Sequence, residues 1–305
     1  MPSFVTPAVK LNYVQIGDGD HLVMIHGLGA NLSFWYFGAA NVLAARHRLV
    51  MYDLRGHGRS SMPREGYDLP QMARDLLELL DFLAIERADI VGHSFGGRVA
   101  LVFAAFYPQR VRNLIIADTH IRALQPPMRL AEWPHWPRWR AELQRSGLTE
   151  LPSDDAFIDH DLLAKLSGQR NVPHADNAGG RLTLRASDMG GKALQRWRLL
   201  LAQTSAARDF EDERELTPAT FATVRAPTLL LFGKFTYCLP SGEGLAQCLP
   251  DARLVVIPGA GHFFPLVRAR FFARATERFL ANAQAGGGRS AARRQMRRRF
   301  AAALA

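Results

Sequence analysis

Cysteine is nearly absent from this chain of 305 residues, which contains only Cys238 and Cys248. Two cysteines cannot build the disulfide framework that holds small secreted domains together. Neither has the His or Cys neighbours along the sequence that a zinc site requires. We therefore interpret both as small buried thiols and expect no metal site.

Long apolar runs are absent as well. No segment approaches the roughly 18 uninterrupted apolar residues of a transmembrane helix. The first ten residues, MPSFVTPAVK, lack the apolar core of a secretory signal. These absences predict a cytoplasmic protein without a transmembrane segment.

Acidic residues are missing from residues 284–305, which carry six arginines. These six leave only +4 of the net charge of +10 for the rest of the chain, so the globular part is mildly basic. We expect a disordered tail. The alternative is an amphipathic helix that forms on anionic lipid, nucleic acid or an acidic partner. Nothing resembles a sequence-reading nucleic-acid module, so we expect no specific nucleic-acid partner.

The sequence does contain short apolar runs separated by amphipathic helical patterns. Continuous runs are typical of strands covered by helices on both faces, and their alternation with helices predicts an α/β fold with a mostly parallel central sheet. An earlier segment, 11–16, alternates more and ends in the turn sequence GDGD, which predicts a hairpin at the sheet edge. The continuous runs are Leu22–Ile25, Leu49–Tyr52, Ile90–Val91, Leu114–Ala117, Thr228–Phe232 and Leu254–Ile257.

This rhythm stops between residues 119 and 216, where strand-like runs are absent and helical patches remain. We interpret the segment as a helical cap inserted after the sixth strand. Residues 1–118 and 217–283 then form the core, and 284–305 the tail. The spacing of the tryptophans at 133, 136 and 139 across two prolines argues against a regular helix there.

The strongest local motif is Gly92-His93-Ser94-Phe95-Gly96-Gly97, between an apolar run and a helical pattern. A nucleophile at a sharp strand-to-helix turn needs nearly side-chain-free residues two positions before and after it. The following helix directs its first amides towards charge that develops beside the serine. The alternative is a serine that merely caps the helix.

Three further motifs accompany this turn: His26-Gly27-Leu28-Gly29, the D-x-R-G-x-G-x-S sequence of residues 53–60, and Gly259-Ala260-Gly261-His262. Together the four resemble the α/β-hydrolase family, over about residues 10–282. The resemblance implies an oxyanion hole made by the backbone amides of Leu28 and Phe95. It also makes His262 the catalytic histidine, because this residue follows the last strand. His26 and His57 belong to structural turns.

The usual third member of the family's triad is missing. The family places an acid in a G-x-x-D pattern after the seventh strand, and here Thr236 occupies that position, with Pro240 setting the register. A threonine hydroxyl cannot stabilise an imidazolium by charge. The replacement is Asp118, at the end of the sixth strand, where some relatives carry the acid. A structural Asp118 is the alternative, and Glu243 is a poorer candidate.

The resemblance and the serine nucleophile imply acyl transfer through an acyl-enzyme on Ser94 without a cofactor. We expect a small apolar carboxylic ester, or a related lactone or thioester, as substrate. Trp133, Trp136 and Phe263 are predicted substrate contacts, although the tryptophans could simply pack the cap. Two other functions stay open: a small-molecule sensor with weakened catalysis, suggested by Thr236, and a carbon–carbon bond hydrolase. Phe263 counts against the latter, because those relatives commonly have tryptophan after the histidine.

Overall fold

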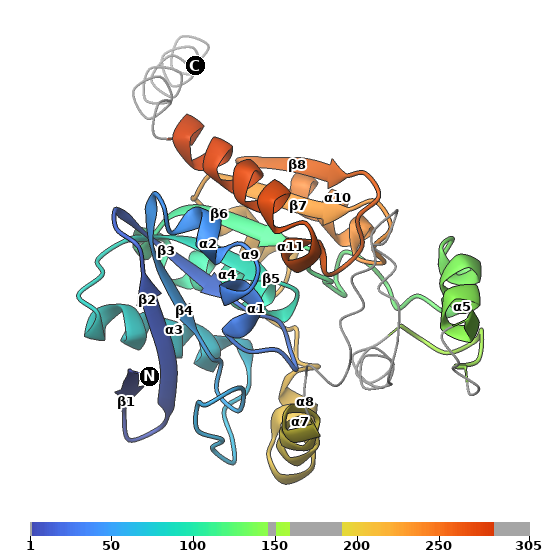
Figure 1. Ribbon diagram of the computed structural model, residues 1–305, viewed down its shortest axis with the longest axis horizontal. Coiled ribbons are helices and arrows are strands. Elements are labelled where there is room, and N and C mark those ends of the chain that lie inside the picture. Colours follow the sequence, from blue (N-terminus) through green and yellow to red (C-terminus); the bar gives the residue numbers. More distant parts are fainter. Residues whose placement is uncertain (1, 146–150, 159–190, 284–305) are drawn as a thin grey trace.

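The centre of the molecule is an eight-stranded sheet with the order β1-β2-β4-β3-β5-β6-β7-β8 (Figure 1). The computed structural model describes residues 2–145, 151–158 and 191–283. Neighbouring strands from β4 to β8 run parallel, whereas β1 and β2 are antiparallel to their neighbours. The predicted α/β class and mostly parallel sheet are confirmed. The strands are β1 (Ser3–Val5), β2 (Lys10–Ile16), β3 (Asp20–Ile25), β4 (His47–Tyr52), β5 (Ala88–His93), β6 (Val111–Ala117), β7 (Thr228–Gly233) and β8 (Ala252–Ile257).

The predicted hairpin was placed on the wrong pair of strands. The GDGD turn joins β2 to β3, but β2 pairs with β4, whose residues lie between β2 and β3 in the sheet. The antiparallel edge pair is instead β1 with β2. A turn sequence shows that the chain reverses, but the strand that becomes the neighbour depends on packing across the whole sheet.

Helices cover both faces of the sheet, and each face has its own apolar core. One core joins α3, α4, α9 and α10 to strand residues such as Val23, Ile25 and Ile90. The other joins α1, α2, α11 and the helix of residues 269–283 to the alternate strand residues Leu22, Met24 and Val91. Strand side chains alternate between the faces, so continuous apolar runs supply both cores. The helices are α1 (Ser33–Tyr36), α2 (Ala40–Leu43), α3 (Leu69–Phe82), α4 (Phe95–Phe106), η1 (Pro108–Arg110), α10 (Leu239–Cys248) and α11 (Phe264–Val267).

The described part of the insertion between β6 and β7 contains helices joined by irregular segments, with one isolated β-bridge between Arg129 and Phe157 and no named strand. It contains η2 (Leu130–Glu132), α5 (Trp136–Arg145), α7 (Gly191–Gln203), α8 (Ala206–Asp209) and α9 (Pro218–Thr223). Figure 1 shows α5 and α7 outside the layers of the sheet. The expectation that no regular helix spans the three tryptophans holds for Trp133, which precedes the helix, but was wrong from Trp136 on, where α5 begins. Its Pro137 lies in the first turn, where a missing N–H costs nothing.

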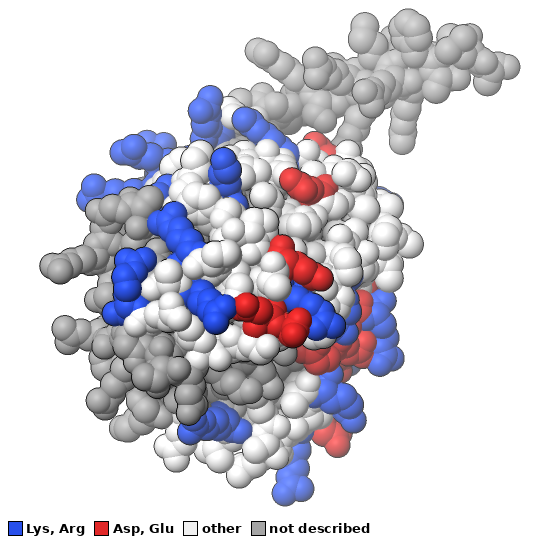
Figure 2. All heavy atoms as spheres, turned by 90° about the vertical axis from the view of Figure 1, so that its right-hand side faces the viewer, with Lys and Arg blue, Asp and Glu red and all other residues white. Residues whose placement is uncertain are grey.

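Basic and acidic side chains share the face of the molecule seen in Figure 2, where acidic groups interrupt the basic ones. This mixture fits a globular part of low net charge. The arginine-rich tail of residues 284–305 lies outside the described residues. None of the helices that the structure describes has the length and apolar character to cross a bilayer.

Two buried histidines connect the end of β3 to the turn after β4. The Nδ1–H of His26 donates to the carbonyl of Gly27 over 2.8 Å, while its Nε2 accepts the amide of Leu54 over 3.1 Å. The Nδ1–H of His57 donates to the carbonyl of Arg55 over 2.9 Å, and the two rings lie 5.4 Å apart. Burial lowers the pKa of His26 to about 4 and that of His57 to about 3.

These two histidines should make the fold acid-sensitive. Below pH 6.5 the unfolded chain takes up protons at both sites, whereas the folded chain stays neutral there until about pH 4 and pH 3. Stability is therefore complete above pH 6.5 and falls with pH, by about 2 kcal/mol for each histidine at pH 5. Urea unfolding at pH 8 and pH 5 measures the loss. His57→Gln should lose about 2 kcal/mol less than wild type over this interval, and an equal loss would contradict the prediction.

Candidate active site

Ser94 lies at a strained turn between β5 and α4. Its backbone has φ 55° and ψ −123°, a conformation that non-glycine residues rarely adopt. A side chain on Gly92 would strike the carbonyl of Gly96, and one on Gly96 would lie 2.6 Å from the carbonyl of His26. The serine caps α4 without a side-chain hydrogen bond, which contradicts the alternative of a merely capping serine. The turn therefore presents a hydroxyl that has no hydrogen-bond partner among the described residues.

The oxyanion loop lies directly against this serine. A Cβ on Gly27 would stand 2.9 Å from Ser94 Cβ and 3.4 Å from Ser94 Oγ. The next amide, that of Leu28, donates no hydrogen bond within the described residues. Phe95 is the first residue of α4, where an amide has no preceding turn to bond. The predicted oxyanion amides thus belong to the residues that follow Gly27 and Ser94, and within the described residues that of Leu28 has no acceptor.

His262 follows β8 and is held against the residue that precedes the serine. The Nε2–H of His93 donates to the carbonyl of His262 over 2.9 Å, and the two rings lie 4.8 Å apart. Phe34 stacks on the other side of the His93 ring at 4.7 Å. His93 therefore ties the turn at Ser94 to the histidine loop, a role that its place in the motif did not predict.

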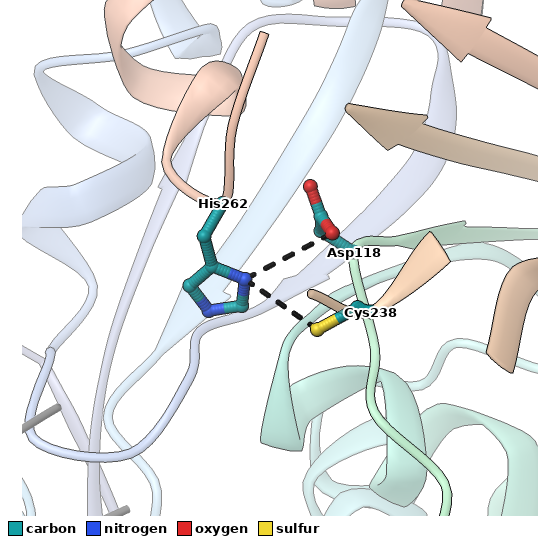
Figure 3. A group of neighbouring side chains, drawn as sticks. All are labelled: Asp118, Cys238 and His262. Atoms are coloured by element: carbon teal, nitrogen blue, oxygen red, sulfur yellow. Dashed lines mark hydrogen bonds and ion pairs between the residues drawn. The ribbon is translucent and has the colours of Figure 1, made fainter. Parts of the chain in front are cut away.

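Asp118 is fully buried at the end of β6 and faces the imidazole of His262 (Figure 3). Its Oδ1 lies 3.9 Å from Nδ1 of His262 and accepts no hydrogen bond, while its Oδ2 accepts the amide of Gly233 over 3.3 Å. Like Ser94, Asp118 has a positive φ, 50°. Only three described non-glycine residues do, and the third is Ala84. Such strain concentrates at functional positions.

Neither Thr236 nor Glu243 places a carboxylate beside Nδ1 of His262 in the described structure. Thr236 is buried beside Asp118, and its hydroxyl accepts the amide of Cys238 over 3.1 Å. Thr236 also hydrogen-bonds Asp118, and its hydroxyl carries no charge of its own. Glu243 is exposed on α10, and no ion pair joins it to His262 within the described part of the chain. The carboxylate that faces Nδ1 is that of Asp118.

Burial dominates the electrostatics of this pair. It lowers the pKa of His262 to about 4, so the imidazole is neutral near pH 7 and able to accept a proton. Burial also raises the pKa of Asp118, and hydrogen bonds from Thr236, Gly233 and Cys238 oppose that rise. These donors favour the ionised carboxylate that an imidazolium needs as its partner.

No hydrogen bond joins Ser94 Oγ to His262 in the described residues. Catalytic hydrogen bonds are commonly long or poorly aligned without substrate and tighten when it binds. The contact of His93 with the carbonyl of His262 ties the histidine loop to the residue before Ser94.

Cys238 is the residue that sequence reasoning missed. The interpretation that no metal-ligating residue accompanies the cysteines is wrong in three dimensions, because Cys238 Sγ lies 3.9 Å from Nδ1 of His262. Asp118, Cys238 and His262 place their ligand atoms within 4.8 Å of one another. The three residues follow the adjacent parallel strands β6, β7 and β8, whose carboxyl ends share one edge of the sheet. That shared edge was the available signal.

The predicted substrate contacts divide into two groups. Phe263 is half-buried, and its ring lies 5.0 Å from that of His262. Trp133 and Trp136 are buried in the larger core and both pack against Trp139. The indole of Trp136 also donates to Asp154 over 2.7 Å. Their surroundings favour the packing role for the two tryptophans, and a contact with substrate stays a prediction.

A cavity of about 450 Å³ opens beside the oxyanion loop. It lies between the loop of residues 29–33, the turn of residues 56–59 and the α7 residues Arg196, Trp197 and Leu200. Ser94, Asp118 and His262 do not line it. The convergence of the reactive groups, rather than this neighbouring cavity, locates the candidate site.

The model of the alpha/beta hydrolase fold family matches residues 20–269. The chain therefore belongs to this family, as its sheet order, its turn at Ser94 and its histidine loop indicate.

Several hydrolases are similar to this chain. It is 29% identical over 287 residues to 2-hydroxymuconate semialdehyde hydrolase of Pseudomonas sp. (strain CF600), covering 92% of this chain and 94% of that relative. The crystal structure of a hydrolase from Pseudomonas aeruginosa PA01 has 28% identity and a TM-score of 0.65, covering 92% and 97%. The enol-lactonase from Burkholderia xenovorans LB400 shares the fold, with 22% identity and a TM-score of 0.64 over 92% and 100%. These findings support a hydrolase.

Proposed function

We propose that the protein is a serine hydrolase that cleaves a small carboxylic ester, or a related lactone or thioester, through an acyl-enzyme on Ser94. One observation carries the proposal. A strained serine without a structural partner lies against the oxyanion loop, next to a histidine whose Nδ1 faces a buried carboxylate. This combination serves nucleophilic acyl transfer.

The reaction begins when Ser94 Oγ attacks the carbonyl carbon and its proton passes to Nε2 of His262. The amides of Leu28 and Phe95 donate to the oxyanion, and Asp118 stabilises the imidazolium. Collapse of the tetrahedral intermediate breaks the carbonyl–oxygen bond, and His262 gives its proton to the leaving alcohol. Water then attacks the acyl-enzyme with His262 as base, which releases the acid and restores the serine.

An apolar acyl group fits the immediate surroundings best, because the Phe263 ring flanks His262. The neighbouring cavity, which the reactive residues do not line, mixes apolar residues such as Trp197 with charged ones such as Arg196. The likeness to an enol-lactonase keeps lactones among the candidates. No step requires a metal or an organic cofactor. A cytoplasmic location and residues 119–216 as the cap remain predictions.

A panel of p-nitrophenyl esters with acyl chains of increasing length tests the proposal. We expect hydrolysis with a kcat/KM that rises from acetate to a medium chain, because each buried CH₂ contributes about 0.8 kcal/mol, or roughly fourfold. Intact mass measurement during turnover should show the protein plus one acyl group. Tight binding of these esters without turnover would contradict the proposal and support the sensor.

A second candidate function is carbon–carbon bond hydrolysis, which one specific comparison favours. The 2-hydroxymuconate semialdehyde hydrolase of Pseudomonas is similar over 92% of this chain. Phe263 at the position after the histidine counts against it. Turnover of 2-hydroxymuconate semialdehyde with a kcat/KM far above that of every ester would replace the first proposal.

A further inference from the structure

The Nδ1 side of His262 meets two potential metal ligands instead of the single carboxylate that acyl transfer uses. Asp118 Oδ1 and Cys238 Sγ each lie 3.9 Å from this nitrogen, as the dashed lines in Figure 3 show. In the proposed reaction the Cys238 thiol takes no part in proton transfer, and its one contribution is a hydrogen bond that favours the ionised Asp118. An imidazole, a thiol and a carboxylate converging on one point are the ligand types that zinc prefers.

An unsatisfied oxygen at the centre of this group also indicates a ligand. Asp118 Oδ1 is fully buried and accepts no hydrogen bond. A buried polar atom without a partner is costly, and a cation placed among the three residues would supply that partner. Among the described residues, the one backbone amide that donates to Asp118 is that of Gly233, and it reaches the other oxygen, Oδ2.

We propose that Asp118, Cys238 and His262 form a binding site for a zinc-like divalent cation that switches the hydrolase off. The ligands would be the thiolate of Cys238, the carboxylate of Asp118 and the neutral imidazole of His262. The two negative charges would balance the charge of the buried cation. In a tetrahedral site the nitrogen and sulfur ligands stand about 3.5 Å apart. The observed 3.9 Å needs only a small contraction. Solvent reaches His262, whose side chain is 14% exposed, and thereby gives the cation a path.

The cation would inhibit hydrolysis by changing which nitrogen of His262 carries the proton. This half of the inference rests on the proposed function. In the active form Nδ1–H donates to Asp118, and the bare Nε2 accepts the proton of Ser94. A cation on Nδ1 displaces that proton, so the neutral imidazole carries its hydrogen on Nε2. The thiol of Cys238 releases its own proton to the solvent. A protonated Nε2 cannot act as a base, and Asp118 is no longer its partner.

Cobalt and zinc titrations of the full-length, chelator-treated protein test the site without relying on activity. Bound Co²⁺ should show a thiolate-to-cobalt charge-transfer band in the near ultraviolet, and calorimetry should show zinc binding at one site. Cys238→Ala should abolish the band and weaken zinc binding at least about 100-fold. Replacing a residue that only hydrogen-bonds a metal ligand already lowers metal affinity by about 10- to 100-fold, and removing a ligand should cost more. Cys238→Ser serves the same purpose should the alanine variant fail to fold.

Two matched variants locate the site. Cys248→Ala removes the other cysteine, which is half-buried at the end of α10, and should keep the band. Ser94→Ala should also keep it, because Ser94 is not a ligand. Zinc should inhibit ester hydrolysis by wild type, and a chelator should restore the rate. The rate of Cys238→Ala, compared with its own rate in chelator, should not change in the same zinc.

The outcomes separate this inference from the proposed function. An active esterase that shows no cobalt band, or a band that survives Cys238→Ala, overturns the metal site alone. A protein that binds cobalt through Cys238 but hydrolyses no acyl substrate contradicts the proposed function and the inhibitory half. Zinc that binds at the site without slowing hydrolysis overturns the inhibitory half alone.

Discussion

Replacement of Ser94 by alanine is expected to lower kcat for ester hydrolysis by about 10⁵- to 10⁶-fold, the loss seen when the nucleophile of a triad is removed. The substitution deletes the atom that attacks the carbonyl, and no other hydroxyl of the described chain occupies a strained turn beside the oxyanion loop. Steady-state kinetics with the best ester of the panel measure the loss. Labelling by a fluorophosphonate should disappear in the same variant.

The fold should survive this substitution. The hydroxyl of Ser94 makes no hydrogen bond to α4 and caps nothing, so its removal breaks no structural contact. The urea midpoint should therefore stay at or slightly above the wild-type value. Ser61→Ala is the matched control, because that hydroxyl accepts the amide of Lys10 at an exposed edge, and its kcat should be unchanged. Substantial hydrolysis by Ser94→Ala would place the nucleophile elsewhere.

Local patterns were sufficient to predict most of the sheet but not its strand order. Apolar runs such as Leu49–Tyr52 coincide with buried strand residues because both of their faces meet helices. The turn after β2 was recognised, yet β4 rather than β3 pairs with β2. That choice depends on contacts between segments far apart in the chain. The helix that begins at Trp136 is a similar case. Its indole donates a hydrogen bond to Asp154, and the spacing of the tryptophans could not reveal that partner.

The candidate site was predictable where a motif has a local physical cause. Glycines two positions before and after Ser94 are required by the tightness of the turn itself, so the motif indicates the strain. The sequence made Asp118 a candidate but could not show that it approaches His262. That approach depends on the sheet order, in which β7 lies between β6 and β8. Cys238 was overlooked for the same reason. Its nearest ligand partners are distant in sequence and meet only at the shared edge of the sheet.

Asparagine in place of Asp118 is expected to lower kcat by about 10³- to 10⁴-fold with little change in KM. The carboxylate holds the proton of His262 on Nδ1 and stabilises the imidazolium, and an amide of the same shape does neither. Within the described residues, Asp118 makes no hydrogen bond or ion pair with the oxyanion loop, so binding of the ester should be spared. Kinetics of the purified variant, with its fold checked by circular dichroism, measure the separate effects on kcat and KM.

Thr236→Ala is the informative comparison, because Thr236 stands where the family usually has its acid. Its hydroxyl assists Asp118 by a hydrogen bond that lowers the pKa of that carboxyl, so the variant should lose about tenfold in kcat at most. The loss should shrink as the pH rises, since a carboxyl with a higher pKa still ionises at higher pH. A larger loss in Thr236→Ala than in Asp118→Asn would remove Asp118 from the triad and leave His262 without its charged partner.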